Sequence, residues 1–299
     1  MVGISMKLGV ALSGGGIRGM AHIGVLKALE EEDIQIDSIS GTSAGAIIAG
    51  LYAYGYSAVE IEKLVHHSIN GIIDVNYRGI LTSLLNFKDL KTRGLSGLIK
   101  GERLEDLFKK LTNDCWICDT QIPIAIPAVG VHNGVTYYFS SRKIHFIGQK
   151  HKQGIQNIKL YEAMRASMAF PALFVPKKLH RWGQEVWLMD GGVTDNLPIS
   201  ILMELGAQKV IGVHLGYNGR IMKEVDSFIE IGEQALSIMM YYREKEFYKQ
   251  TTKNIYILNP EIWNVSLLQI KSIQQCIDQG YQSMKVHLPI IQKQWEKFV

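Results

Sequence analysis

Ser43 lies between Gly41 and Gly45, where one apolar run of the sequence ends and another begins. The runs 34–39 and 46–51 predict a strand followed by a helix, which places the serine at the sharp turn between them. Glycine on both sides permits the strained turn and lets the helix pass close to the strand. A hydroxyl at the amino end of a helix is suited to nucleophilic attack, because the helix dipole and free N–H groups stabilise a developing oxyanion. The alternative is an ordinary small-residue turn without chemistry.

A glycine-rich loop stands upstream of that turn, between a predicted buried strand at 7–12 and a predicted helix at 20–32. Its glycines are Gly14, Gly15, Gly16 and Gly19. Consecutive N–H groups without side chains form a nest for a phosphate or an oxyanion. The loop lacks the Gly-Lys-Ser/Thr ending of a P-loop, which argues against a nucleotide site. Asp37 begins the next strand instead of ending it, which argues against a dinucleotide site despite the G-x-G-x-x-G spacing.

A third element is an aspartate at the end of a predicted apolar strand. Asp190 follows the run 187–189 and precedes Gly191 and Gly192. This pattern predicts a carboxylate on a tight loop at the carboxyl edge of the sheet, where catalytic groups of α/β proteins collect. An Asp-Gly turn taken alone is common and carries little functional weight.

In this order, the three elements resemble the signatures of the patatin-like phospholipase family, and 165–176 resembles the stretch that precedes the family's aspartate. The resemblance spans about residues 7–200. It implies an α/β fold, namely a three-layer α/β/α sandwich around a mainly parallel sheet, and hydrolysis of the acyl esters of phospholipids or lysophospholipids by a Ser–Asp dyad. A glycerophospholipid or another acyl ester is then the expected substrate.

The resemblance also assigns roles to individual residues. Ser43 is the expected nucleophile and Asp190 the expected base. The expected oxyanion hole comprises Gly14, Gly15, Gly16 and Arg18, and the remaining motif positions are Gly19, Gly41, Gly45, Gly191 and Gly192. A solvated carboxylate with a pKa near 4 is a weak base toward a hydroxyl, so burial of the aspartate is expected to raise its pKa.

Two other functions stay open at this stage. A Ser–His acyltransferase or thioesterase would need a histidine base, for which His22 and especially His214 are candidates. Against an α/β-hydrolase, Ser43 follows only one strand and one helix, whereas that fold places its serine deep in the sheet. A non-enzymatic lipid- or acyl-binding protein would keep the fold and the anion nest, but it needs neither Ser43 nor Asp190.

Composition fits one compact enzyme that needs no cofactor or metal. The 299 residues are 47% hydrophobic, and no H-E-x-x-H or similar ligand spacing is present. The three cysteines are typical of a reducing compartment, and the lone pair Cys115 and Cys118 is more typical of a loop coincidence than of a redox or zinc site. Without a signal peptide or a spanning segment in the sequence, we expect a cytoplasmic protein, at most peripheral to membranes.

Charge is concentrated in one segment. Between 141 and 184, nine Lys and Arg residues oppose the single acid Glu162, with Phe174 and Trp182 beside them. This strip either docks on an anionic lipid surface or is an ordinary solvated face. No motif that reads a nucleic-acid groove accompanies the charge, so we expect no nucleic-acid partner.

The expected organisation is a catalytic domain at 7–200, followed at 201–299 by the last sheet strand and a helical extension packed on the same domain. The extension reads as a helix at 224–250, a strand at 254–258 and a helix at 266–296, which either cover the core or form a homo-oligomer contact. Asn133-Gly134 predicts a hairpin turn between two strands. The segment 74–100 is either a mobile cap or a loop packed on the core.

Overall fold

The computed structural model describes residues 6–68, 74–75, 97–181, 183–217, 219, 228–249, 253–262, 265 and 269–296. Most of the segment expected to be a cap or a packed loop therefore lies outside the described residues, as does Trp182 of the basic strip.

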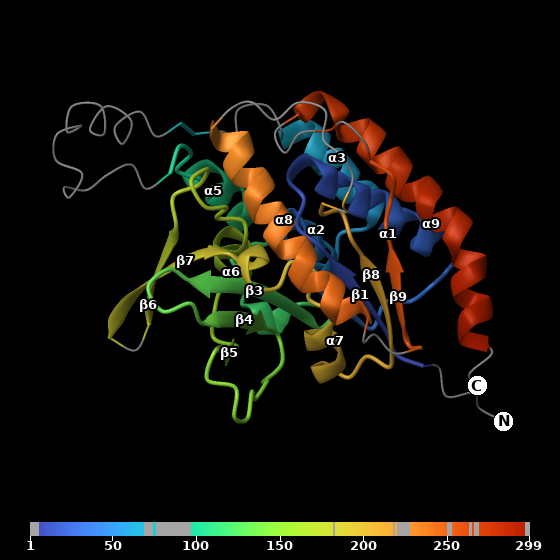
Figure 1. The fold of residues 1–299 in the computed structure, drawn as a ribbon, viewed down its shortest axis with the longest axis horizontal. Helices are drawn as coiled ribbons and strands as arrows, with labels where there is room; N and C mark the ends of the chain where they lie inside the picture. The colour runs from blue at the N-terminus through green and yellow to red at the C-terminus, as the bar shows by residue number, and fades with distance from the viewer. Residues whose placement is uncertain are drawn as a thin grey trace.

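The centre of the fold is a mixed, mostly parallel sheet with nine strands in the described part of the chain (Figure 1). The strands pair in the order β5-β4-β3-β2-β1-β8-β9, and the hairpin β6–β7 is attached to β3. Their bounds are β1 Leu8–Leu12, β2 Ser38–Gly41, β3 Ile124–Gly130, β4 Thr136–Ser140, β5 Lys152–Ile155, β6 Lys177–Arg181, β7 Gln184–Asp190, β8 Lys209–Val213 and β9 Ile255–Leu258.

Parallel pairing joins β1 to both β2 and β8. All five residues of β1 are buried, as expected for a central strand covered on both faces. The predicted hairpin is confirmed, because β3 and β4 pair antiparallel on either side of Gly134, which has a left-handed φ of 65°.

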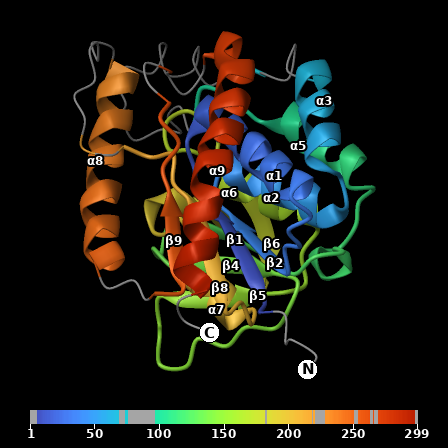
Figure 2. The ribbon, with the colours of Figure 1, turned by 90° about the vertical axis from the view of Figure 1, so that its right-hand side faces the viewer.

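Helices cover both faces of the sheet, as the resemblance implied. Figure 2 shows α1, α2 and α3 on one side of the sheet and α8 on the other. The helices are α1 Ala21–Glu31, α2 Ala44–Tyr54, α3 Ala58–Ser68, α5 Glu102–Leu111, α6 Leu160–Ser167, α7 Ser200–Glu204, α8 Phe228–Lys249 and α9 Ile273–Glu296. Within the described ranges, four short 3-10 helices are η1 Gly16–Met20, η2 Ile117–Asp119, η3 Gly191–Val193 and η4 Ile270–Ser272.

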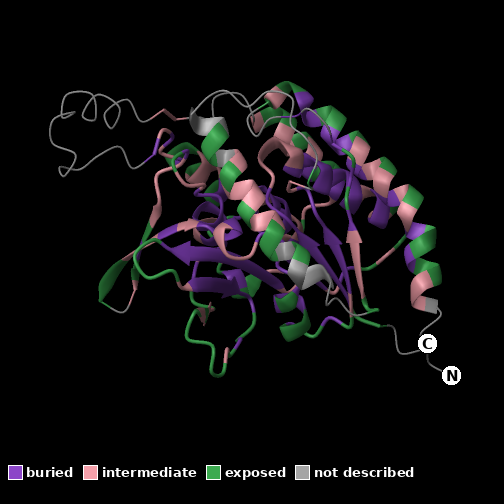
Figure 3. Cartoon of the chain, viewed as in Figure 1, coloured by how far each residue is buried: buried purple, intermediate pink, exposed green. Residues whose placement is uncertain are grey.

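The core has two parts because side chains alternate between the faces of each strand. Val10 and Leu12 belong to the large cluster beneath α1, α2, α6 and α9, whereas Ala11 between them belongs to the smaller cluster beneath α7. Figure 3 shows the central strands as buried and the outward faces of the helices as exposed. The central strands, such as β1, are thus covered from both sides, which holds their ends in place.

The last helix packs directly against the first. A Cβ added at Gly24 of α1 would collide with the backbone carbonyl of Ile277, and one added at Gly280 of α9 would collide with that of Ala21. The two backbones therefore touch at this crossing, and only glycine allows that approach. The expectation that the C-terminal segment forms helices over the core is met by α8 and α9; the division at residue 200 stays a prediction.

Candidate active site

The turn between β2 and α2 is strained at Ser43, which has φ 55° and ψ −122°. A Cβ at Gly41 would collide with the carbonyl of Gly45, and one at Gly45 would collide with the carbonyl of Leu12. These contacts explain why both flanking positions are glycine. The Ser43 N–H donates to the Ser167 Oγ at 3.1 Å, which ties the turn to the end of α6. The serine thus stands at the amino end of α2 in a conformation that its surroundings impose.

Asp190 reaches Ser43 from an antiparallel strand. The strand β7 pairs antiparallel with β3, with Asp190 opposite Ala128. Its Oδ1 accepts from the Gly192 N–H at 2.7 Å. Its Oδ2 is buried and has no partner of ordinary hydrogen-bond geometry, although the Ser43 hydroxyl lies close enough to influence its protonation. The sequence predicted that Ser43 and Asp190 lie close together, but not that Asp190 ends a strand that runs antiparallel to β3.

The pKa of Asp190 is raised to about 6, because burial penalises the charged form. The Ser43 hydroxyl and the Gly192 N–H oppose that rise by stabilising the carboxylate. A buried carboxylate with a pKa of about 6 is ionised at neutral pH and is a better proton acceptor than a solvated one. The sequence-based expectation of a raised pKa thus agrees with the structure.

The glycine loop lies against the Ser43 turn, where a Cβ added at Gly14 would be 3.2 Å from the Ser43 Cβ. The Gly14 N–H is already engaged, since it faces both the Oδ1 of Asn196 at 3.1 Å and the backbone O of Asn196 at 3.2 Å. Gly16 has a left-handed φ of 56°, and the Gly15 carbonyl accepts from the Arg18 N–H at 3.2 Å. The N–H groups of Gly15 and Gly16 have no protein acceptor within the described chain. They are the donors of this loop that remain for an anion.

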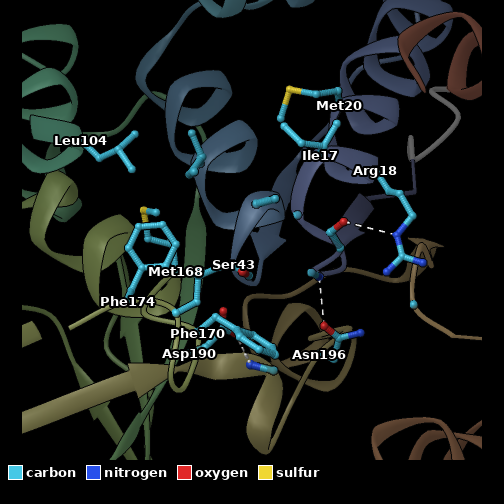
Figure 4. A pocket seen from close by; sticks show the side chains of 18 of the residues that line it. Ile17, Arg18, Met20, Ser43, Leu104, Met168, Phe170, Phe174, Asp190 and Asn196 are labelled. Atoms are coloured by element: carbon cyan, nitrogen blue, oxygen red, sulfur yellow. Dashed lines mark hydrogen bonds between the residues drawn. The ribbon is translucent and has the colours of Figure 1, made fainter. Parts of the chain in front are cut away.

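A cavity of about 380 Å³ opens above these groups and is mostly apolar. Figure 4 shows Ser43, Asp190 and Phe170 close together, with Met168 and Phe174 on one side of them and Asn196 and Arg18 on the other. Further apolar walls come from α2, α3, α5 and α8, for example Ile47, Leu64, Leu104, Phe108 and Leu236. An apolar cavity with a few convergent polar groups at one end is suited to a ligand with a long apolar part.

A family model for patatin-like phospholipases matches residues 10–203. The chain belongs to the patatin-like phospholipase family. The matched segment contains the glycine loop, the Ser43 turn and Asp190, so it includes every residue of the predicted site. The segment from β8 onward, with α8 and α9, lies beyond the match.

Curated patatin-like relatives are identical to this chain at about three tenths of the aligned residues. A patatin-like phospholipase domain-containing protein of Caenorhabditis elegans, ZK370.4, is 31% identical over 214 residues, which are 70% of this chain and 14% of that protein. Lysophospholipase NTE1 of Mycosarcoma maydis is 29% identical over 211 residues, or 71% of this chain and 10% of that protein. The chain therefore spans about a seventh or less of the length of these two relatives.

Two solved structures show the same fold at low identity. VipD from Legionella pneumophila has a TM-score of 0.52 and 16% identity, covering 95% of this chain and 66% of VipD. Human GIVD cytosolic phospholipase A2 has a TM-score of 0.53 and 7% identity, covering 98% of this chain and 62% of that chain. The patatin-like α/β architecture predicted from the motifs is thereby confirmed.

Neither candidate histidine lines the cavity of this patatin-like site. His22 is fully buried, and its Nε2 is 2.7 Å from the Ser13 carbonyl. Burial lowers the pKa of His22 to about 4, so the ring is neutral and donates from Nε2 to that carbonyl. His214 follows β8 and packs beneath Gly216. Both are core histidines, which disfavours the Ser–His alternative.

The basic strip is less exposed than the sequence predicted. Arg165 is buried and donates to the carbonyls of Lys100, Gly101 and Val175, so it anchors the cavity wall beside Phe174. Three of the lysines are paired with carboxylates, namely Lys159 with Asp114, Lys177 with Glu105 and Lys178 with Glu185. Much of the positive charge is therefore neutralised locally, and the strip offers an anionic surface fewer free cations than its composition implies.

The remaining sequence candidates contribute no chemistry to the site. Cys115 and Cys118 are both free thiols, and burial raises the pKa of Cys115 to about 11, which leaves it protonated. Among the described residues, no three His, Cys, Asp or Glu side chains gather in a way that would hold a metal ion. No described helix has the length and hydropathy needed to traverse a bilayer.

Sequence reasoning missed two residues that hold this patatin-like site together. Asn196 is buried and binds the glycine loop, and Ser167 binds the Ser43 turn. Ser167 lies within the stretch 165–176 and Asn196 lies four residues after Gly192, but nothing in the local pattern gives either residue a role. Sequence reasoning also left the role of α8 open, whereas that helix supplies part of the cavity wall.

Proposed function

We propose that this protein is a serine acyl hydrolase that cleaves acyl ester bonds of phospholipids or lysophospholipids, with Ser43 as nucleophile and Asp190 as base. The observation that carries the proposal is the unpaired, buried Oδ2 of Asp190 next to the Ser43 hydroxyl at the base of an apolar cavity. The lysophospholipase names of related proteins point to the same substrate class.

Acylation begins when the Asp190 carboxylate takes the proton of the Ser43 hydroxyl as its oxygen attacks the ester carbonyl. The carbonyl oxygen becomes an oxyanion, toward which the Gly15 and Gly16 N–H groups and the amino end of α2 are directed. Preorganised donors of this kind stabilise a developing charge more than the neutral ester. The intermediate collapses when the protonated Asp190 gives its proton to the departing alcohol oxygen, which leaves an acyl-Ser43 ester.

Deacylation repeats the same steps with water. Asp190 removes a proton from a water molecule whose oxygen attacks the acyl carbonyl, and the second oxyanion occupies the same N–H groups. Return of that proton from Asp190 to the Ser43 oxygen releases the fatty acid and restores the enzyme. The apolar cavity holds the acyl chain throughout, and each buried methylene contributes ~0.8 kcal/mol to binding.

A panel of esters that all carry the same kind of acyl chain tests this proposal: a diacyl phospholipid, a lysophospholipid, a monoacylglycerol and a thioester. We expect hydrolysis of the phosphate-bearing esters by the parent protein and none by Ser43→Ala. A fluorophosphonate probe is expected to label the parent at Ser43 and not the variant. Full labelling of Ser43→Ala would refute the assignment of the nucleophile, and tight lipid binding without turnover in the parent would identify a binding protein.

A further inference from the structure

Two cations line a cavity that is otherwise mostly apolar. Arg18 comes from the glycine loop, and Arg243 comes from α8, beyond the segment that the family model matches. Asp190 is the acid in the cavity lining. Fatty acyl chains do not require cations, so the two guanidinium groups indicate that a negatively charged part of the ligand is accommodated beside the ester.

Arg243 stands at the rim of the cavity, because it is exposed and also lines it. Its Nη1 donates to the Val193 carbonyl at 2.9 Å, in the loop that begins at Asp190. Burial and the nearby Asp195 carboxylate raise the pKa of Tyr138, and the charge of Arg243 opposes that rise, which places the guanidinium near this buried pair. α8 thus carries a cation to the loop that holds the proposed base.

The fixed hydrogen bond leaves most of the guanidinium available. An arginine has five N–H donors in a planar fork, and Arg243 makes one hydrogen bond within the described chain. Arg243 as a whole is exposed, and the planar guanidinium group of an arginine suits bidentate binding of a phosphate. Arg18 belongs to the glycine loop, where its Nε donates to the Gly15 carbonyl at 3.4 Å, whereas Arg243 stands at the exposed rim.

We propose that Arg243 is a specificity-determining residue that binds the phosphate of the lipid head group while the acyl ester lies at Ser43. This inference rests on the proposed function and narrows it to phosphate-bearing esters. The acyl chain occupies the apolar interior, the carbonyl meets the Gly15 and Gly16 N–H groups, and the alcohol half extends toward the exposed rim. In a lysophospholipid that half carries the phosphate, which meets Arg243 at the rim.

The test compares two substrates with the same oleoyl chain, lysophosphatidylcholine and monooleoylglycerol, in micelles of a neutral detergent. For Arg243→Gln we expect kcat/KM on lysophosphatidylcholine to fall at least about tenfold more than kcat/KM on monooleoylglycerol. A factor of about ten is the effect that loss of one charge-assisted hydrogen bond usually has on binding. Arg243→Lys keeps the charge but not the fork and is expected to be intermediate. Lys245→Gln is the matched control, because Lys245 is exposed on the same helix and does not line the cavity.

The outcomes separate this inference from the proposed function. Equal losses on both substrates would mean that Arg243 only fastens α8 to Val193, and equal losses in Lys245→Gln would indicate a general surface-charge effect; either result overturns the assignment. Inorganic phosphate is not expected to inhibit monooleoylglycerol hydrolysis. Inhibition that Arg243→Gln removes would assign the site to free phosphate instead of a head group. Absence of turnover on every ester would refute the proposed function itself.

Discussion

Asn196 holds Gly14 by two acceptors at once, its side-chain Oδ1 at 3.1 Å and its backbone O at 3.2 Å from the same N–H. The same Oδ1 lies close to Gly192, where an added Cβ would be 3.2 Å from it. One buried amide thus sits between the glycine loop and the loop of Asp190. Asn196 therefore contacts both the loop of the proposed oxyanion donors and the loop of the proposed base.

The first prediction follows from this link. Asn196→Ala removes one acceptor of the buried Gly14 N–H and lets the glycine loop shift, and displacement of an oxyanion donor by about 1 Å costs roughly 100-fold in rate. We expect kcat to fall by about that factor, with KM changed much less, because the loop acts in the transition state. Steady-state kinetics on a soluble short-chain ester measure the changes in kcat and in KM separately.

Asn196→Asp is the matched variant for this prediction. It retains an oxygen that accepts from Gly14, but its negative charge near Asp190 is expected to raise the pKa of that carboxyl further. The pH below which kcat/KM declines should therefore be higher in Asn196→Asp than in the parent. A rise in KM alone, with kcat intact in both variants, would show that Asn196 contacts substrate instead of positioning the loop.

The second prediction concerns pH. The base must be ionised to accept a proton, so kcat/KM is expected to rise with pH through the pKa of Asp190, about 6, and to level off above it. With an unperturbed aspartate as base, kcat/KM would instead rise near pH 4. A pH–rate profile measured between pH 4 and 9, with folding followed by circular dichroism, distinguishes the two. A flat profile from pH 5 upward would contradict a buried base.

Replacement of the proposed base should change activity and stability in opposite directions. Asp190→Asn is expected to lower kcat at least about 100-fold. Burial disfavours the charged carboxyl, so the parent loses stability as pH rises from 3.8 through about 6, whereas the neutral amide does not. At pH 8 the variant should be more stable by an amount on the order of 2–3 kcal/mol, with no gain near pH 3.5.

Urea unfolding of both proteins at the two pH values measures this effect. A variant that is less stable than the parent at pH 8 would mean that the carboxylate is favourably solvated in the fold. Near-normal turnover of Asp190→Asn, with His214→Ala inactive, would instead revive the Ser–His alternative.

A further prediction uses two glycines with similar, left-handed φ angles. Gly16 has φ 56° and Gly134 has φ 65°, so alanine at either position costs about 1–2 kcal/mol of backbone strain. The N–H of Gly16 is one of the two proposed oxyanion donors, whereas Gly134 lies in the β3–β4 turn. We expect similar losses of thermal stability in Gly16→Ala and Gly134→Ala, but a loss of kcat of about tenfold or more only in Gly16→Ala. Equal kcat values in the two folded variants would exclude this N–H as a catalytic donor.

The sequence predicted the local parts of the site well. The strand, turn and helix around Ser43 are specified by neighbouring residues, since Gly41 and Gly45 allow the close backbone contacts that the turn requires. Asp190 was predicted to follow an apolar strand, and in the structure it is the last residue of β7. Its strand direction was not predicted, because β7 pairs back on β6 across Gly183 in a hairpin that the alternating residues did not reveal.

The contacts that fasten those parts together could not be predicted in the same way. Gly14 and Asn196 are 182 residues apart, and Ser43 and Ser167 are 124 residues apart. Such pairs arise only when the sheet order brings separate loops to one place, and a single Asn or Ser carries no periodic pattern that would mark it. Arg243 is likewise an ordinary helix residue in the sequence, and it gains its position from the packing of α8.

The sheet has a consequence for how the molecule can be divided. The family match ends at residue 203, before β8, yet β8 pairs with β1 along all five of its residues and β9 continues the sheet beyond it. In a chain cut after residue 203, β1 would lose β8 as its neighbour. The strand, which is wholly buried here, would become an exposed apolar edge that can pair with another molecule. Size-exclusion chromatography of that truncation should give aggregates instead of a monomer. The motifs lie within the first two thirds of the chain, but the strands that cover the edge of their sheet come from the last third.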